Sequence, residues 1–419
     1  MPFAEHPSEG LNRRDFLVGA GAVGAALLAP QVLGTRVAYA ADGTAATATN
    51  TVITVFLRGG ADGLRILAPN SAALGRDYLA AVRGPLVPGN GQLVALPGTG
   101  GWGLHAALRP LYDLLWAGGE LAFVPAVSAQ GVTRSHFQAE QFLEKGGSNT
   151  ISTGWWDRVL ALLGPGQGFR AVAHGWRAPA SMAGDQTKLA ISSLDEFAFP
   201  GWDEIRARSQ KAVSALYAGQ PGVLGADVAA TMAAVGTAAT IRRQAGVRNG
   251  AVYPEGRLSA ALADLASILR AEVGLRVATV DVDGFDTHTD EVTELDALLT
   301  GVAGSLAAFL TDLGPARRAR VTVVVQSEFG RRVPMNDSGG ADHGTGGLIW
   351  LLGGGVAGQA VHGRWRPLTS RSALADGDVP SLNNVFDVLG EVVQKRLGVG
   401  SLATVFPGHT MSPLGVART

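Results

Sequence analysis

The sequence predicts an α/β fold, and three features of its 419 residues support this prediction. Short apolar runs rich in β-branched residues recur along the chain, and they lack the alternation of half-exposed strands, which favours buried, parallel strands. Stretches with helical spacing separate several of these runs. Polar loops rich in glycine follow the runs, as expected where an open α/β sheet carries its binding site.

Composition narrows the class of protein further. Hydrophobic residues make up 47% of the chain and charged residues 16%, which is typical of a globular protein. The formal net charge of -1 gives no electrostatic case for nucleic acid or an anionic membrane surface as a partner. The absence of cysteine excludes a thiol nucleophile and disulfides, so any metal must bind oxygen and imidazole ligands.

The N-terminus has the features of a twin-arginine export signal. Arg13 and Arg14 precede an apolar run rich in glycine and alanine, Val18 to Pro30, and Ala38-Tyr39-Ala40 matches a cleavage site. A membrane-spanning helix is the alternative, but the run is short for one. We expect a signal peptide over residues 1–40, a flexible lead-in over 41–50 and one α/β domain over 51–419. The partner during export would be the twin-arginine translocase, and the mature chain would be periplasmic, cell-surface or extracellular, without a stable membrane span.

The first predicted strand, Thr51 to Leu57, leads into the glycine-rich sequence RGGADGL, which places Asp62 at the carboxyl end of the strand. An ordinary Asp-Gly turn is the alternative. A loop (Pro69 to Gly101), a helix (Leu104 to Trp116) and a strand (Glu120 to Ala126) are expected next.

The sequence TRSHF places Ser135 where it can cap a helix that continues to Lys145. A hydroxyl at a helix N-terminus faces free amide groups, which also favour an anion. Ser135 is therefore a candidate nucleophile, with Arg134 and His136 as candidate anion-binding neighbours, and a plain helix cap is the alternative.

The middle of the chain carries mainly structural signals. A helix from Gly154 to Leu163 and strands at Phe169 to His174 and Lys188 to Ser193 are expected. Three alanine-rich helical patterns follow without clear strands between them, which predicts a helical insertion over about residues 200–273. They are Asp203 to Ala218, Val223 to Gln244 and Leu258 to Val273.

A strong strand pattern, Leu275 to Val282, precedes the sequence DGFDTHTD. Residues two apart in an extended segment point the same way, so Asp286 and His288 can face one metal ion. A long helix, Asp290 to Leu313, is expected to follow.

The last candidate loop lies between two apolar runs, Val321 to Val325 and Leu348 to Leu352, and it carries Glu328, Arg331 and His343. Three strand ends thus carry acid or imidazole groups, which predicts one shared metal site. Ordinary turn residues at strand ends are the alternative. A final helix is expected over Ser381 to Val399.

Together, the sequences RRDFL, FLRGGADGL, TRSHF, GWWDR, GFDTH and SEFGRR…DHGTGG resemble the domain of unknown function 1501 family of exported bacterial proteins. That family resembles the alkaline phosphatase and sulfatase superfamily. The resemblance implies an alkaline-phosphatase-like three-layer sandwich, with a mostly parallel central sheet, helices on both faces and a metal-dependent hydrolase site at the strand ends.

The resemblance also implies roles for single residues. Ser135 would be the nucleophile, and the metal ligands would be Asp62, Asp286, His288, Glu328 and His343. Independently of the resemblance, the charge and position of the residues make Arg331 a second candidate catalytic residue and Arg58, Arg134 and His136 candidate anion-binding residues. Two features depart from the superfamily pattern: only Thr287 separates Asp286 from His288, and Phe329 stands where another histidine is common.

The sequence therefore predicts an exported metal-dependent hydrolase of phosphate or sulfate esters, acting on a small-molecule or polymer ester with a divalent ion such as zinc, calcium or manganese. The alternative is a non-catalytic exported binding or assembly protein with a degenerate metal site. A carbohydrate-related surface protein is a third reading, suggested by the eight tryptophans. No nucleotide cofactor is expected, since GxGxxG is absent after the first strand and no Walker-type lysine occurs.

Overall fold

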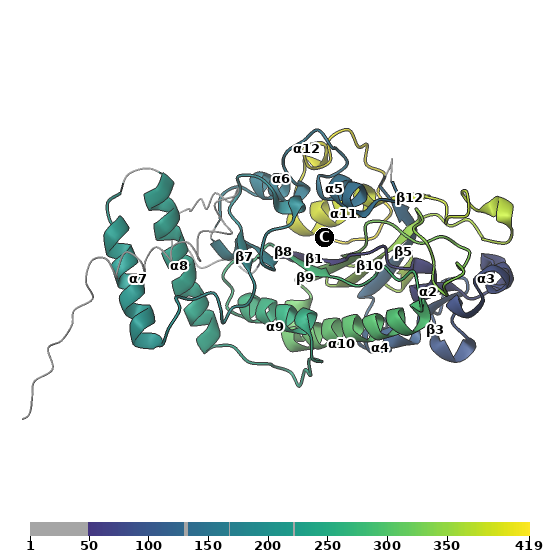
Figure 1. Cartoon of the computed structure of the whole chain (residues 1–419), viewed down its shortest axis with the longest axis horizontal. Helices are drawn as coiled ribbons and strands as arrows, with labels where there is room; N and C mark the ends of the chain where they lie inside the picture. Colours follow the sequence, from purple (N-terminus) through teal and green to yellow (C-terminus); the bar gives the residue numbers. More distant parts are fainter. Residues whose placement is uncertain (1–48, 130–132, 167, 221–222) are drawn as a thin grey trace, which may run out of the picture.

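The computed structural model describes residues 49–129, 133–166, 168–220 and 223–419. The predicted signal peptide and most of the lead-in lie outside these residues. The described chain forms a central nine-stranded sheet with helices on both faces, so the predicted three-layer α/β architecture is confirmed (Figure 1).

Nine strands form the central sheet in the order β11-β5-β10-β9-β1-β8-β6-β7, with β12 beside β5. Their bounds are β1 Thr51–Leu57, β5 Leu121–Ser128, β6 Ala171–His174, β7 Leu189–Ile191, β8 Val277–Val282, β9 Val321–Gln326, β10 Gly347–Gly353, β11 Ala360–Val361 and β12 Asn383–Asn384. The middle strand, β1, is parallel to both β8 and β9. β10 is antiparallel to both β9 and β5, so β5 points the same way as β9.

The register brings the carboxyl ends of the three central strands to one edge. Leu57 of β1 lies opposite Val282 of β8, and Phe56 lies opposite Gln326 of β9. Since the predicted site residues follow these strands, the topology gathers their loops at this edge.

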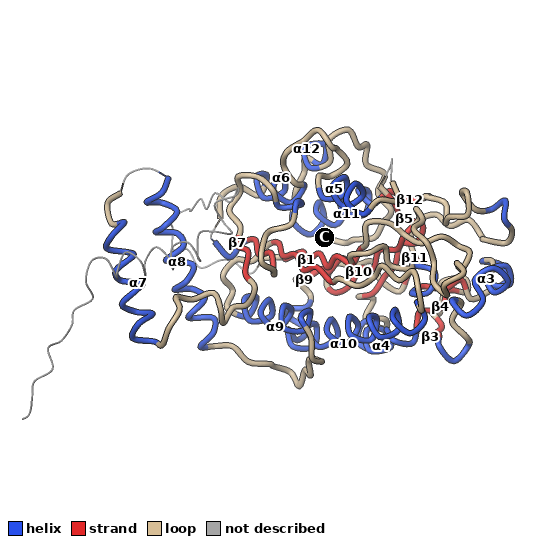
Figure 2. The backbone as a smooth tube through the Cα atoms, viewed as in Figure 1, coloured by secondary structure: helices blue, strands red, loops and turns tan. Residues whose placement is uncertain are grey.

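Helices cover both faces of the sheet (Figure 2). One layer contains α4 (Arg109–Leu115), α9 (Arg257–Arg270) and α10 (Glu291–Arg318), and the other contains α5 (His136–Glu144), α6 (Trp155–Leu162), α11 (Val385–Leu397) and α12 (Leu402–Val405). Ile53 and Val55 of β1 pack in one core, and Val52 and Phe56 pack in the other. This burial on both faces explains why β1 lacks alternation.

The three alanine-rich patterns are helices as predicted. α7 (Asp203–Tyr217) and α8 (Val223–Arg243) lie at the β7 end of the molecule, whereas α9 packs along α10 beneath the sheet (Figure 1). α10 is long and apolar enough to cross a membrane, but most of its apolar stretch is buried in the core. A kink at Gly314, before Pro315, falls where the predicted helix ends.

The segment predicted as a loop from Pro69 to Gly101 contains more structure than expected. It includes α3 (Arg76–Arg83), and a small antiparallel sheet joins β2 (Leu67–Pro69), β3 (Leu93–Ala95) and β4 (Trp102–His105). The helix predicted from Leu104 therefore begins only at Arg109, with Pro110 in its first turn, where a missing N–H costs nothing.

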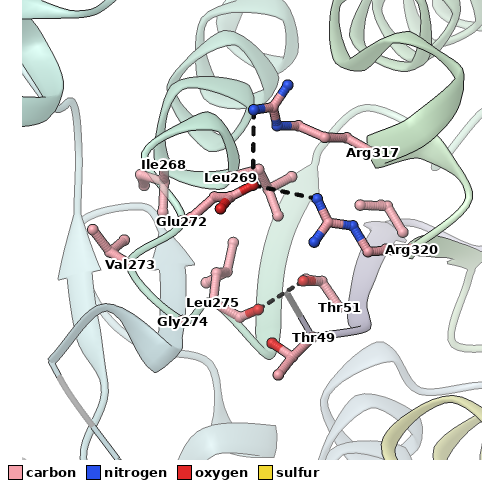
Figure 3. Close-up of a pocket in the computed structure, with 11 residues that line it drawn as sticks. Thr49, Thr51, Ile268, Leu269, Glu272, Val273, Gly274, Leu275, Arg317 and Arg320 are labelled. Carbon is pink, nitrogen blue, oxygen red and sulfur yellow. Dashed lines mark hydrogen bonds and ion pairs between the residues drawn. The ribbon is translucent and has the colours of Figure 1, made fainter. Parts of the chain in front are cut away.

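A small cavity lined in part by paired charges lies at the opposite, amino end of the central strands. This cavity of about 30 Å³, room for about one water molecule, lies beside the amino end of β1 (Figure 3). Arg317 and Arg320 lie 3.8 and 3.4 Å from the carboxylate of Glu272, and the Thr51 hydroxyl donates to the Leu275 carbonyl at 2.7 Å. Both arginines at this end therefore have an acidic partner, and the predicted site residues lie at the carboxyl ends of the strands instead.

Candidate metal centre

Two loops and the start of a helix meet at the carboxyl edge of the sheet. The loop after β8 carries Asp286 and His288, the long β9–β10 loop carries His343, and α5, the helix after β5, begins at His136. The β9–β10 loop folds back on itself, and the backbones of Arg331 and His343 form an antiparallel β-bridge there. The Gly344 N–H donates to the Gly330 carbonyl at 2.8 Å. A Cβ at Gly344 would lie 2.5 Å from the Arg331 backbone, so this close approach requires glycine.

The side chains from these loops converge. One ligand atom each from His136, Asp286 and His343 lies within 4.8 Å of the others. His288 joins them, because its Nε2 lies 2.9 Å from His343 Nε2 and 3.0 Å from Asp286 Oδ1. His136 Nε2 lies 3.3 Å from Asp286 Oδ2. Three imidazole nitrogens therefore surround one carboxylate.

The other ring nitrogen of each histidine contacts a hydrogen-bond acceptor. His136 Nδ1 lies 2.6 Å from Glu328 Oε1, His288 Nδ1 lies 3.2 Å from Asp342 Oδ1, and His343 Nδ1 lies 2.8 Å from the Arg134 carbonyl. An Nδ1–H that donates to such an acceptor leaves the Nε2 lone pair directed at the centre, as in histidine ligands of metals. The arrangement thus fits a divalent metal.

Asp286 is well suited to remain a carboxylate in this cluster. Burial raises the pKa of Asp286, but contacts from His343 and Arg331 outweigh burial and lower the pKa to about 2. Its charge is therefore present throughout the neutral range.

Glu328, predicted as a ligand, lies beneath the cluster. Its carboxylate is fully buried and accepts from the Gly59 N–H and the Ser327 hydroxyl, both at 2.9 Å, besides facing His136. In this position Glu328 orients the imidazole of His136, which was predicted to bind an anion. One feature of the sequence could have indicated His136 as a metal ligand. The helix that begins at His136 follows β5, and the carboxyl end of β5 lies at the same edge as the other ligands.

The structure does not bring Asp62 into the cluster. Its side chain caps α2 (Gly63–Ile66) by accepting from the Leu64 N–H at 2.9 Å, and it forms a buried ion pair with Arg83 of α3. Arg83 lies in the segment predicted as a loop, and its position on α3 is what brings this cation to Asp62. Glu291 lies beside the pair, and burial followed by the charge of Asp62 raises the pKa of Glu291 to about 9.

Arg331, predicted as a second catalytic residue, lies in the interior of the protein. The residue is 1% exposed, and its guanidinium donates to the Gly60 and Ala341 carbonyls at 2.6 and 2.9 Å. It also donates to the Phe285 carbonyl and to Asp286 Oδ1, both at 2.8 Å, and to the Gly59 carbonyl. Arg331 thereby fastens the loops after β1, β8 and β9 together.

Two other predicted anion-binding residues also have acidic partners. Arg58 pairs with Glu144 and lies 3.1 Å from Asp281. Arg134 lies 2.9 Å from the buried Asp378, yet 41% of its side chain remains exposed. Arg134 is therefore the more accessible of the two.

Ser135 lies directly before α5 with an extended backbone, at the N-cap position that was predicted. Among the described residues, its hydroxyl makes no capping hydrogen bond. The hydroxyl is thus at a helix N-terminus, adjacent in sequence to His136.

The fold and the cluster define an α/β protein with a histidine and aspartate site of the kind that holds a divalent metal. Residues 10–30 match the twin-arginine translocation pathway signal sequence, so the chain is exported by that route. Residues 127–402 match the family described as protein of unknown function DUF1501, and the chain belongs to that family.

Solved structures provide more distant comparisons. Alkaline phosphatase from the Antarctic bacterium TAB5 aligns over 74% of this chain and 93% of its own, with 13% identity and a TM-score of 0.29. PsFucS1 sulfatase from Pseudoalteromonas sp. aligns over 97% of this chain and 78% of its own, with 12% identity and a TM-score of 0.33. No curated protein matches this sequence significantly. The architecture described above rests on the sheet topology and not on these low TM-scores.

Proposed function

We propose that this chain is an exported, metal-dependent hydrolase of phosphate or sulfate esters. The observation that carries the proposal is the convergence of three histidine Nε2 atoms on Asp286, with each Nδ1 facing an acceptor. Imidazole-rich sites favour zinc, whereas calcium and manganese prefer ligand sets made of oxygen, so zinc is the proposed ion.

A bound divalent ion would supply Lewis-acid stabilisation of the negative charge that develops on the ester. The ligands in the proposal are His136, Asp286, His288 and His343, and Glu328 holds His136 in orientation. The Ser135 hydroxyl would form the bond to phosphorus or sulfur as the alcohol leaves, and water would then release the acid. The free N–H groups at the start of α5 favour an anion beside Ser135.

Two measurements on the exported protein test this proposal. Metal analysis is expected to find a divalent ion, and aryl phosphate and sulfate esters are expected to be hydrolysed. Ser135→Ala should lower turnover at least about a thousandfold while leaving the metal content unchanged. Ser148→Ala is the matched control, since Ser148 is a partly exposed serine whose hydroxyl, among the described residues, contacts Thr150. Equal turnover by the wild type and Ser135→Ala would remove Ser135 from the mechanism.

One observation favours a second function, an exported binding or assembly protein with a structural metal. The three histidines and Asp286 supply four ligands, and four protein ligands close a tetrahedral zinc site. This alternative predicts bound metal without turnover of any ester, together with a loss of stability when the metal is removed.

A further inference from the structure

A large cavity with both polar and apolar side chains in its lining lies near the loop that carries His343. Its volume is about 820 Å³, within the range of sites that take drug-sized ligands. The walls come from the ends of β5 and β12, the start of α11 and the C-terminal tail. Thr345 lines it, two residues after His343, so the cavity and the centre share the loop between β9 and β10.

The lining of this cavity is mostly uncharged and hydrogen-bonding. Hydroxyl groups and an amide come from Ser128, Ser381, Asn384, Thr410 and Ser412. The carboxylate in the lining, Asp387, already accepts from the Ser412 N–H at 2.7 Å and lies 2.8 Å from His409 Nε2. Neutral donors and acceptors of this kind match the hydroxyl groups of a saccharide-like ligand better than an apolar one.

The cavity also contains a cation without a partner. Arg364 is exposed, and its guanidinium pairs with no acidic group in the described part of the chain. Its backbone is held in place, because its N–H donates to Asn383 Oδ1 at 2.8 Å and its carbonyl accepts from Asn383 Nδ2 at 2.9 Å. Asn383 is itself buried, so a fixed backbone presents a free guanidinium, which suits a carboxylate, sulfate or phosphate group.

We propose that this cavity binds a hydroxyl-rich, saccharide-like group that carries an anion, with the anion at Arg364. Its role as the site for the alcohol part of the cleaved ester rests on the proposed function. Its role as a binding site does not, because the binding groups are separate from His136, Asp286, His288 and His343.

Isothermal titration calorimetry with lactobionate, and with lactose as the uncharged comparator, tests this inference on the full mature protein. Wild type is expected to bind lactobionate more tightly than lactose. Arg364→Ala should weaken lactobionate binding about tenfold or more, and Arg364→Lys should weaken it less, because it keeps the charge. Lactose affinity should be the same in all variants. Arg366→Ala is the matched control, because Arg366 is exposed and does not line the cavity.

The outcomes separate this inference from the hydrolase proposal. Lactobionate binding that is absent, or that falls equally in Arg364→Ala and Arg366→Ala, overturns the cavity inference even if aryl esters are hydrolysed. If lactobionate binding depends on Arg364 but no ester is hydrolysed, the binding-site inference is supported and the hydrolase proposal is contradicted. Ser135→Ala should bind lactobionate as the wild type does, and thermal melts of each variant verify that it folds.

Discussion

At the scale of single residues, the pair of Asp62 and Glu291 makes stability depend on pH. Both carboxyl groups are buried, and Arg83 is the cation that pairs with Asp62. Burial raises the pKa of Asp62, but Arg83, Glu291, the Leu64 N–H and Arg331 together outweigh burial, so Asp62 stays charged and its pKa lies below the ordinary value. Glu291 is then the group that keeps a proton at neutral pH, with its pKa raised to about 9.

The sign of the pH dependence follows from the direction of this shift. The pKa of Glu291 in the folded chain is raised above the unfolded value of about 4.3, so its stabilising contribution is complete below that value and is lost as pH rises through about 9. Glu291→Gln keeps a neutral group at all pH values. We expect the wild type to lose at least about 1 kcal/mol relative to Glu291→Gln between pH 5 and pH 9.

Urea unfolding of both proteins at several pH values measures this difference. Glu294→Gln, at an exposed position one turn further along α10, is the control and should follow the wild type. A constant gap between wild type and Glu291→Gln from pH 5 to pH 9 would show that Glu291 does not bind the extra proton.

At the scale of elements, Arg331 joins loops that the sheet brings to one edge. Its loss would leave buried carbonyls of Gly59, Gly60, Phe285 and Ala341 without this donor. Each unsatisfied buried acceptor is costly, so Arg331→Gln should lower the free energy of unfolding by about 3 kcal/mol or more. Denaturant unfolding in the presence of chelator isolates this effect from metal binding.

Arg332→Gln is the matched control for Arg331→Gln. Arg332 is the next residue along, but 32% of its side chain is exposed and it lies 3.8 Å from Asp378. Its removal should change stability by about 1 kcal/mol or less. Equal losses in the two variants would contradict a clamping role for Arg331.

The same elements show how far sequence reasoning reaches. The strands β1, β8 and β9 can be predicted because burial on both faces leaves apolar runs without alternation in the sequence. Asp286 and His288 can be placed together because residues two apart in an extended segment share a side. Asp62 was misplaced for another reason. Its partner Arg83 lies on α3, whose surroundings are rich in glycine and proline and gave no helical signal. Long-range partners of this kind are set by packing, which one sequence does not display.

At the scale of the whole molecule, the metal centre connects segments far apart in the chain. His136 follows β5, Asp286 and His288 follow β8, and His343 lies between β9 and β10. An ion that binds all of them binds only the folded chain, so it stabilises folding. At a free metal concentration about a hundredfold above Kd, the gain is about 2.7 kcal/mol.

Removal of the metal should therefore lower the melting temperature. For a domain of this length, the loss corresponds to about 3 to 4 °C in Tm, measured by calorimetry with and without chelator. His343→Ala should melt at the same temperature in both conditions, because it lacks a ligand. His362→Ala should keep the response of the wild type, since His362 contacts the Ala357 carbonyl outside the centre. Elemental analysis verifies that the chelator has removed the metal. If the Tm of the wild type is then unchanged, the centre does not connect these segments energetically.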